Sequence, residues 1–355
     1  MLTKRLFGED NGKEIYEYTL KNANGIEVSC LNYGCAITRI ITPDQRGNFE
    51  NIVLGFQDFE SYRNNVIYAG VIVGRVAGRI KNACFNLADK TYTLAKNDGK
   101  NHLHGGLKGF HNVVWAANTT EKESETTVTF SYTSPDGEDG YPGTVKMLVT
   151  YTLNDNNEFV IQYCGTSDQA TLLNPTNHTY FNLSGDLKQD ITDHVLQIDS
   201  SSFLELTEDL LPTGKLIAAR DTVFDFRTGR KIIEGIKSDA AQNKIVGHGY
   251  DHPFVLNSNN NREIVLEDRE SGRRVIIETD AVGVVLYTGN MIPNNLDFCG
   301  VKSQRYLGLC LETQGLPDSI HHANFPDCIL HKDQTFSKVT KYTFSCEKRD
   351  EERQA

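Results

Sequence analysis

The sequence contains no apolar run approaching the roughly 18 residues that a membrane-spanning helix needs. Its first ten residues, MLTKRLFGED, lack the apolar core of a secretory signal peptide. Basic residues are fewer than acidic ones, 36 against 47, and the net charge of −11 disfavours contact with nucleic acid or anionic membranes. These absences predict a cytoplasmic protein that acts on a small neutral or cationic molecule.

Several common catalytic and binding motifs are also missing. The eight cysteines are scattered and form no CxxC pair, which is typical of reduced thiols rather than of a disulfide framework or a zinc site. There is no GxxxxGK[ST] phosphate loop, no GxGxxG dinucleotide fingerprint and no GxSxG nucleophile elbow. The sequence therefore predicts neither a nucleotide cofactor nor a nucleophilic serine.

Long helical patterns are absent, and strand patterns dominate instead. Short runs rich in Val, Ile, Thr, Tyr and Phe recur between Gly, Asn and Asp clusters, without a linker. This pattern predicts an all-β protein, an antiparallel sandwich or barrel, with one domain over residues 1–346 and a polar tail over 347–355. The clearest expected strands span residues 126–134, 143–153, 158–165, 262–268, 273–279, 284–289, 306–313 and 338–345.

Hairpins are expected at residues 154–157 and 269–272, where turn-forming residues separate two strand patterns. Short helices are expected at residues 58–65 and 228–236. The stretch TNHTYFNLSG (176–185) places a histidine inside a strand-like run. Because strands alternate faces, His178 and two further polar residues, Tyr180 and Asn182, would share one face.

Two stretches offer cationic or imidazole groups. GRVAGRI places Arg75 and Arg79 four residues apart, either to pair with surface carboxylates or to donate to a polar ligand. NHLHGG places His102 and His104 on one face if the chain is extended there. A metal site would need further ligands, and no carboxylate follows nearby, so a loop histidine that donates to a ligand is the favoured interpretation.

Two other stretches offer carboxylates. In GYDHPF, Asp251 either begins a turn or accepts hydrogen bonds from a ligand. In LCLETQ, Glu312 follows an apolar run and is expected at the exit of a buried strand, where desolvation raises a carboxyl pKa. Glu312 is then either a general base or half of an ion pair. A base, a histidine and several hydroxyl-binding groups without a cofactor suit a sugar-processing enzyme.

Seven stretches, in order and spanning nearly the whole chain, resemble the aldose 1-epimerase (galactose mutarotase) family. They are GRVAGRI, NHLHGG, SPDGEDGYPG, NPTNHTYFNLSG, GYDH, LYTGN, and LCLETQGLPDS with NFP. The resemblance implies a large antiparallel β-sandwich with few short helices and a sugar-binding cleft. It also implies interconversion of the α and β anomers of aldohexoses such as galactose and glucose, in a monomer or weak dimer, without a metal or other cofactor.

The resemblance also implies roles for particular residues. Glu312 matches the family's catalytic base and His178 its acid. Arg79, His104 and Asp251 match the substrate-binding positions, and Arg75 matches none. One departure is Val285, which stands where many members have glutamine, two residues before the tyrosine of LYTGN.

Three other functions remain open at this point. A glycoside hydrolase would use paired carboxylates across a scissile bond. A hexose-phosphate epimerase would need a basic phosphate pocket, which the acidic balance disfavours. A sugar-binding module stacks sugars on exposed aromatic rings, and the single tryptophan, Trp115, makes that function a weak candidate.

Overall fold

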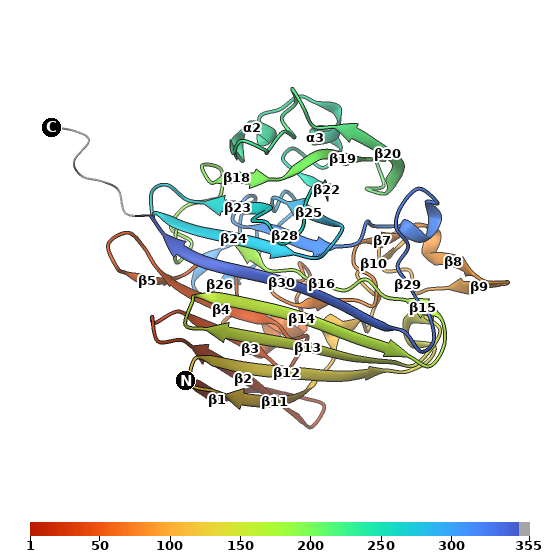
Figure 1. Ribbon diagram of the computed structural model, residues 1–355, viewed down its shortest axis with the longest axis horizontal. Helices are drawn as coiled ribbons and strands as arrows, with labels where there is room; N and C mark the ends of the chain where they lie inside the picture. Colours follow the sequence, from red (N-terminus) through yellow and green to blue (C-terminus); the bar gives the residue numbers. More distant parts are fainter. Residues whose placement is uncertain (348–355) are drawn as a thin grey trace.

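Alternating burial defines the longest strands of the protein. In β13 (Val145–Asn154) every second residue is fully buried, and β12 (Glu125–Ser134), β14 (Glu158–Ser167) and β30 (Thr335–Cys346) largely follow the same rhythm. Such a period places one face of each strand on a core and the other toward solvent. The structure, a computed structural model, describes residues 1–347 and consists mostly of antiparallel strands (Figure 1).

A nine-stranded sheet forms one layer, in the order β11-β12-β13-β14-β30-β24-β23-β18-β21. Its neighbouring strands all pair antiparallel. The C-terminal strand β30 lies in its middle, between β14 and β24, so the two halves of the chain share this sheet. Its remaining strands are β11 (Ala116–Glu121), β24 (Arg273–Thr279), β23 (Ile264–Glu267), β18 (Val195–Ile198) and β21 (Arg230–Lys231).

Two further sheets pack on the nine-stranded one. The six-stranded sheet touches it where the Thr313 and Thr340 hydroxyls lie 2.7 Å apart. The connection between two strands of the five-stranded sheet touches it where the Tyr151 hydroxyl donates to the Cys35 carbonyl at 2.8 Å. One hydrophobic core spans all three, which confirms the predicted β-sandwich. The six-stranded sheet has the order β17 (Tyr180–Phe181), β28 (Leu309–Gln314), β25 (Gly283–Tyr287), β22 (Asp251–Leu256), β19 (Ser200–Leu206) and β20 (Pro212–Ala218). The five-stranded sheet comprises β1 (Leu2–Asp10), β2 (Lys13–Lys21), β3 (Glu27–Leu31), β4 (Ile37–Pro43) and β5 (Phe49–Asn51).

Short elements complete the described part of the chain. Ten strands form two-stranded pairs, which are β6 (Ile72–Val73) with β16 (Thr176–Asn177), β7 (Arg79–Ile80) with β10 (His102–Leu103), β8 (Cys84–Leu87) with β9 (Lys90–Thr93), β15 (Thr171–Leu172) with β29 (Ile329–Leu330), and β26 (Asp297–Phe298) with β27 (Val301–Lys302). The α-helices are α1 (Phe59–Arg63), α2 (Ile233–Ile236) and α3 (Ala241–Ile245). The 3-10 helices are η1 (Lys81–Ala83), η2 (Phe110–Asn112), η3 (Glu138–Gly140) and η4 (Ser319–His321).

The predicted elements are largely confirmed. Each of the eight expected strands is present with its ends within three residues of the predicted ones, and the two expected hairpins join β13 to β14 and β23 to β24. Helix α1 lies within the predicted 58–65, capped where Asp58 accepts from the Ser61 amide at 2.9 Å. The helix predicted over 228–236 is wrong in its first half, because Arg230 and Lys231 pair with β18 at the edge of the sheet.

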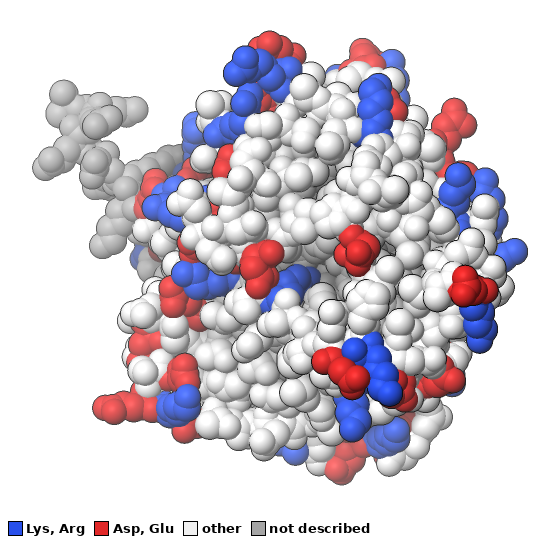
Figure 2. Space-filling view, turned by 45° about the vertical axis from the view of Figure 1, so that its right-hand side comes forward, with Lys and Arg blue, Asp and Glu red and all other residues white. Residues whose placement is uncertain are grey.

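Three features bear on the general class of the protein. Among the described residues, no helix is both long and apolar enough to cross a membrane. In the face shown in Figure 2, charged side chains of both signs are interspersed rather than gathered into a basic patch. No disulfide joins cysteines within residues 1–347. Of the predicted tail over 347–355, all but Glu347 lies outside the described residues.

Candidate active site

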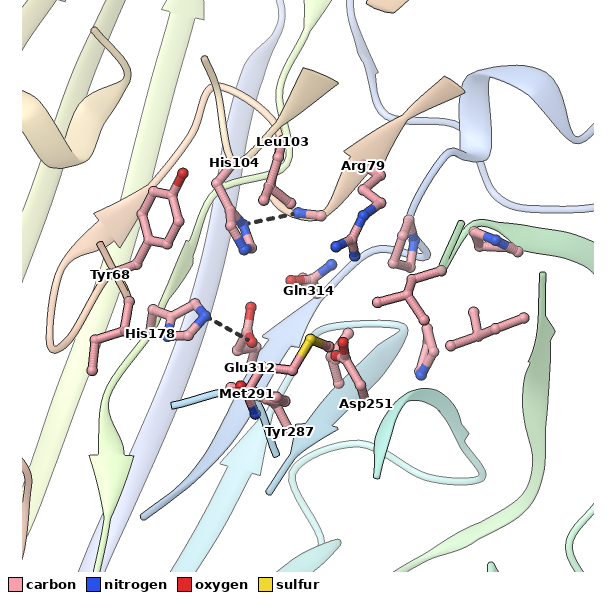
Figure 3. A pocket seen from close by; sticks show the side chains of 18 of the residues that line it. Tyr68, Arg79, Leu103, His104, His178, Asp251, Tyr287, Met291, Glu312 and Gln314 are labelled. Carbon is pink, nitrogen blue, oxygen red and sulfur yellow. Dashed lines mark hydrogen bonds and ion pairs between the residues drawn. The ribbon is translucent and has the colours of Figure 1, made fainter. Parts of the chain in front are cut away.

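The six-stranded sheet forms the floor of a cavity of about 270 Å³ (Figure 3). Alternate residues of three adjacent strands line it, because residues two apart on a strand share a face. These are Glu312 and Gln314 of β28, Val285 and Tyr287 of β25, and Asp251 and Pro253 of β22. The walls come from the segments that carry Tyr68, Arg79, His104, His178 and Leu210. All five site residues predicted from the sequence therefore line one cavity.

Glu312 lies inside strand β28, opposite Val285 of β25, and its side chain is 5% exposed. The prediction that it lies at the strand's exit is wrong, since Thr313 and Gln314 continue the strand as buried polar residues. Burial raises the pKa of the Glu312 carboxyl well above its usual range, and nearby Asp251 adds to the effect. The direction of this shift is the one expected from the sequence.

His178 lies at a break in the strand-like run rather than within a strand. The preceding β16 pairs with β6, whereas the following β17 pairs with β28, so the chain changes sheets at His178. The backbone of His178 donates to the Val71 carbonyl and accepts from the Gly70 amide, at 2.9 and 3.0 Å. This change of sheet ends the simple alternation of faces that the sequence predicted.

Two polar residues near His178 were expected to share its face. The Tyr180 ring does lie 5.1 Å from the His178 ring, and the Tyr180 hydroxyl donates to the Ile67 carbonyl. The amide of Asn182, however, donates to the carbonyls of Gln189 and Leu307. Tyr180 therefore packs against the imidazole, whereas Asn182 braces the backbone elsewhere.

Glu312 and His178 meet on the cavity floor. The Nε2 atom of His178 lies 3.4 Å from a carboxyl oxygen of Glu312 (Figure 3). The Nδ1 atom of His178 lies 3.4 Å from the Cys310 sulfur. Burial lowers the pKa of His178 to about 4, because it disfavours the imidazolium, while it raises that of Glu312. Between these two pKa values the two groups therefore hold one proton between them, and burial alone leaves it on the carboxyl.

The loop histidine His104 faces the cavity, whereas His102 does not. His104 has a left-handed backbone (φ +51°), so the chain is not extended there and the condition under which both rings would share one face is not met. The ring of His102 is held by the Ala95 carbonyl and the Tyr141 hydroxyl. The Gly78 amide donates to Nδ1 of His104 at 3.2 Å, which leaves the proton on Nε2, able to donate to a ligand.

Arg79 and Asp251 face each other across the cavity (Figure 3). The guanidinium of Arg79 donates to Asp98 at 2.7 Å, an ion pair that fixes its direction. Asp251 does not begin a turn, as one interpretation of the sequence had it, but opens strand β22. Burial raises the pKa of Asp251 to about 6, an effect that the charge of Arg79 opposes.

Arg75, the other arginine of GRVAGRI, does not line the cavity. It is 2% exposed and donates to the carbonyls of Pro142, Ser134 and Pro135 and to the hydroxyls of Ser134 and Thr171. Arg75 therefore fits neither interpretation of the sequence: it neither donates to a ligand in the cavity nor pairs with a surface carboxylate. Arg75 instead holds together the loops behind the cavity wall.

Tyr68, His111 and Gln314 also lie close to the site and are not among the residues predicted from the sequence. The Tyr68 ring lies 4.8 Å from that of His104 and 4.9 Å from that of His111, and so fills the wall between them. Gln314 is 1% exposed, and its buried carbonyl oxygen has no hydrogen-bond partner. Its position two residues after Glu312, and so on the same face of a strand, was the available signal.

The described residues contain one group with metal-ligating atoms close together: Nδ1 or Nε2 of His178, Sγ of Cys310 and a carboxyl oxygen of Glu312 lie within 4.8 Å of one another. The histidines of NHLHGG are not part of it. Burial raises the pKa of the Cys310 thiol well above its usual range, and a thiol must lose its proton to bind a metal well. The donor set is therefore better suited to moving protons than to holding an ion.

Comparisons with known proteins agree with one another. The family model described as aldose 1-epimerase matches residues 16–343. A galactose mutarotase of Bos taurus is 36% identical, covering 97% of this chain and 98% of its own. An aldose 1-epimerase of Streptococcus thermophilus is 35% identical over 92% and 93%. The crystal structure of a galactose 1-epimerase from Lactobacillus acidophilus superposes with a TM-score of 0.88 at 30% identity, covering 98% and 99%.

Proposed function

The chain belongs to the aldose 1-epimerase family and is an isomerase that interconverts the α and β anomers of aldoses; we propose that Glu312 and His178 carry its proton transfers. One observation supports this assignment above all: the two groups are buried 3.4 Å apart on the floor of a cavity that also holds hydroxyl-binding side chains.

Anomer interconversion requires one proton to leave the C1 hydroxyl and another to reach the ring oxygen. Glu312 as a carboxylate takes the first proton, and His178 as an imidazolium gives the second. The ring opens to the aldehyde, rotation about C1–C2 exposes its other face, and the hydroxyl adds back while the two groups exchange roles. Each positioned transfer contributes roughly 10²–10⁴-fold.

The reactive form of the pair contains the same number of protons as the resting form. In the cavity without sugar, burial favours protonated Glu312 and neutral His178. Moving that one proton from the carboxyl to the imidazole gives the base and the acid together. Sugar hydroxyls that donate to the carboxylate favour this form, as do the positive charges of Arg79 and Lys338, which lower the pKa of Glu312.

We propose that Arg79, His104 and Asp251 hold the sugar hydroxyls. Arg79 and the Nε2 atom of His104 donate hydrogen bonds, and Asp251 accepts them. The pocket therefore suits hydroxyl groups, which both accept and donate hydrogen bonds. Gln314, with its unpaired buried oxygen, adds a fourth contact of this kind. Val285 offers only an apolar surface beside Glu312, at the position where many family members have glutamine.

The two rival enzymatic functions are not favoured. The relatives are named for anomer interconversion, and a hydrolase acting through Asp251 and Glu312 would leave His178 without a role. Among the described residues that line the cavity, Arg79 is the one arginine or lysine, and it is already paired with Asp98. A sugar phosphate would find little uncompensated positive charge there.

We propose an aldohexose as the substrate. Polarimetry of freshly dissolved α-D-galactose and α-D-glucose tests this directly. The rate constant for approach to equilibrium should rise in proportion to enzyme concentration for at least one of the two sugars. A rate that stays at the uncatalysed value with both would contradict the proposal.

The reaction should not depend on a metal ion. Dialysis against EDTA is expected to leave kcat and KM within about twofold of their starting values, because proton transfer between positioned side chains needs no Lewis acid. The same polarimetric assay provides the measurement. Activity that disappears with EDTA and returns with zinc or manganese would contradict this prediction.

His104→Asn should impair both binding and turnover. The Nε2 atom is proposed to hold a hydroxyl in the ground state and in the transition state alike, so its loss raises KM by about tenfold. Some kcat should be lost as well, because the sugar is less well oriented. Initial rates over a range of sugar concentrations give both constants, and an unchanged KM would remove His104 from the proposed sugar contacts.

A further inference from the structure

Lys338 is a buried lysine on the side of strand β28 opposite the cavity, where β28 is the strand that carries Glu312. It belongs to β30, at the centre of the nine-stranded sheet, and its inward-facing side chain leaves the residue only 5% exposed. Lysine is almost never fully buried unless a charged partner compensates it. Here the Nζ atom contacts two backbone carbonyls and one aromatic ring, none of which carries a full charge.

The two carbonyls come from the two segments that carry the catalytic pair. Nζ donates to the carbonyl of Thr313, which directly follows Glu312, at 2.8 Å. It also donates to the carbonyl of Pro175, three residues before His178. The ammonium group lies 4.3 Å from the centre of the Tyr163 ring, which occupies its remaining side. One cation therefore joins the backbone beneath Glu312 to the backbone that leads to His178.

Neutral hydrogen bonds already connect these two segments. The Thr176 hydroxyl donates to the same Thr313 carbonyl at 2.9 Å, and Asn174 exchanges hydrogen bonds with the backbone of Gly315 at 2.8 and 3.1 Å. These bonds can align the segments that carry Glu312 and His178 without any buried charge. What Lys338 adds is a positive charge near Glu312, and that charge favours the carboxylate over the acid.

We propose that Lys338 is a positioning residue of the reaction, whose charge stabilises the carboxylate form of Glu312 while its two hydrogen bonds fix the spacing of the Glu312 and His178 segments. This inference rests on the proposed roles of Glu312 and His178. Lys338 does not line the cavity, so it acts through Glu312.

Several other ionisable groups face this arrangement. Burial lowers the pKa of Lys338 to about 7, and the charges of Asp280 and Glu312 oppose that shift. Tyr163 of β14 lies beside the ammonium group, and burial raises the pKa of its hydroxyl well above its usual range, so it stays neutral. Glu312 itself faces His178, Asp251 and Arg79. The positive charge of Lys338 is therefore lost as the pH rises through about 7, and its contribution to stabilising the carboxylate should decline with it.

Lys338→Met removes the charge and keeps the length of the side chain. At pH 5.5, where wild-type Lys338 is charged, kcat of the variant should be lower by about 10–100-fold, with KM within about threefold. At pH 9 the wild-type lysine is itself neutral, and the ratio of the two kcat values should shrink to about threefold. Anomer exchange measured by NMR, with the uncatalysed rate subtracted at each pH, provides these ratios.

Thr340→Val is the matched control. Thr340 lies two residues further along the same inward face of β30, and its hydroxyl lies 2.7 Å from that of Thr313. The variant loses a hydrogen bond to the catalytic strand but no charge, so any decrease in kcat should be the same at every pH. A Lys338→Met decrease that is equally independent of pH would overturn the proposal, because it would show a purely structural role.

Two further measurements make the result decisive. If Lys338→Met does not fold, as judged by circular dichroism, Lys338→Arg replaces it. Its guanidinium stays charged, so its kcat relative to wild type should rise above pH 7, and a constant ratio overturns the proposal.

Glu312→Gln separates this proposal from the assignment of Glu312 as the catalytic base. Wild-type kcat in Glu312→Gln would refute the base itself, whereas an inactive Glu312→Gln with a constant Lys338→Met ratio would refute only Lys338.

Discussion

Glu312→Gln should lower kcat for anomer interconversion by roughly 10²–10⁴-fold and leave sugar affinity within about threefold. Glutamine keeps the size of the side chain and its ability to accept a hydrogen bond from a sugar hydroxyl. It cannot accept the C1 hydroxyl proton, so the loss appears in the transition state and not in the ground state.

The measurement combines NMR anomer exchange, for kcat, with calorimetric titration of the sugar, for affinity. Gln314→Ala is a suitable comparison, because Gln314 lies on the same strand face but is proposed only to bind a hydroxyl. Its main effect should be on affinity. A Glu312→Gln enzyme with near wild-type kcat would show that the base is another group.

His178→Asn should lower kcat by a similar factor, with much less change in KM. Asparagine still fits beneath the Tyr68 and Tyr180 rings that pack on His178, but it cannot protonate the ring oxygen. Because that proton is needed only as the C–O bond breaks, its loss raises the barrier without weakening ground-state binding.

The pH profile gives a second readout of the same variant. In the wild type, activity should fall at low pH as the pair gains a second proton, near the pKa of about 4 of His178, and at high pH as it loses its last proton, above the raised pKa of Glu312. In His178→Asn, only Glu312 is left to titrate, and its carboxylate is the active form. Residual activity should therefore rise with pH, whereas His104→Asn should keep its alkaline limb. An alkaline limb that survives in His178→Asn would place the acid elsewhere.

The fold was largely predictable because its longest strands follow period two. β12, β13, β14 and β30 alternate apolar and polar residues over ten residues or more, and that signal is strong in any sheet with one buried face. The two-residue strands around the cavity, such as β6 and β16, are too short to show a period. Their pairing depends on contacts between distant segments, which the sequence does not display.

The site was predictable in composition but not in geometry. Glu312 seemed to end its strand because Thr313 and Gln314 are polar, yet Thr313 is buried against Thr340 of the other sheet. His104 would share a face with His102 in an extended chain, but its backbone is left-handed. In each case a contact made only in the folded protein decides where the polar side chain lies.

The position of Lys338 also depends on contacts between segments that are distant in the sequence. In the sequence it lies between Ser337 and Val339 at the start of a predicted strand, and a lysine is ordinarily a solvent-exposed residue. Only the packing of two sheets brings its ammonium group beneath Glu312 and the segment that leads to His178. Period two in β30 places Lys338 on the same face as Tyr342 and Phe344, but no pattern within one strand indicates which distant segments its ammonium group reaches.

The central claim is that Glu312 and His178 act as one unit that shares a proton, and a double-mutant cycle tests it most directly. NMR anomer exchange would be measured at neutral pH for Glu312→Gln, His178→Asn and the double variant. If the groups work together, the double variant should be no more than about threefold slower than the slower single variant, because either loss already disables the pair. Losses that multiply would show two independent contributions and would contradict the account.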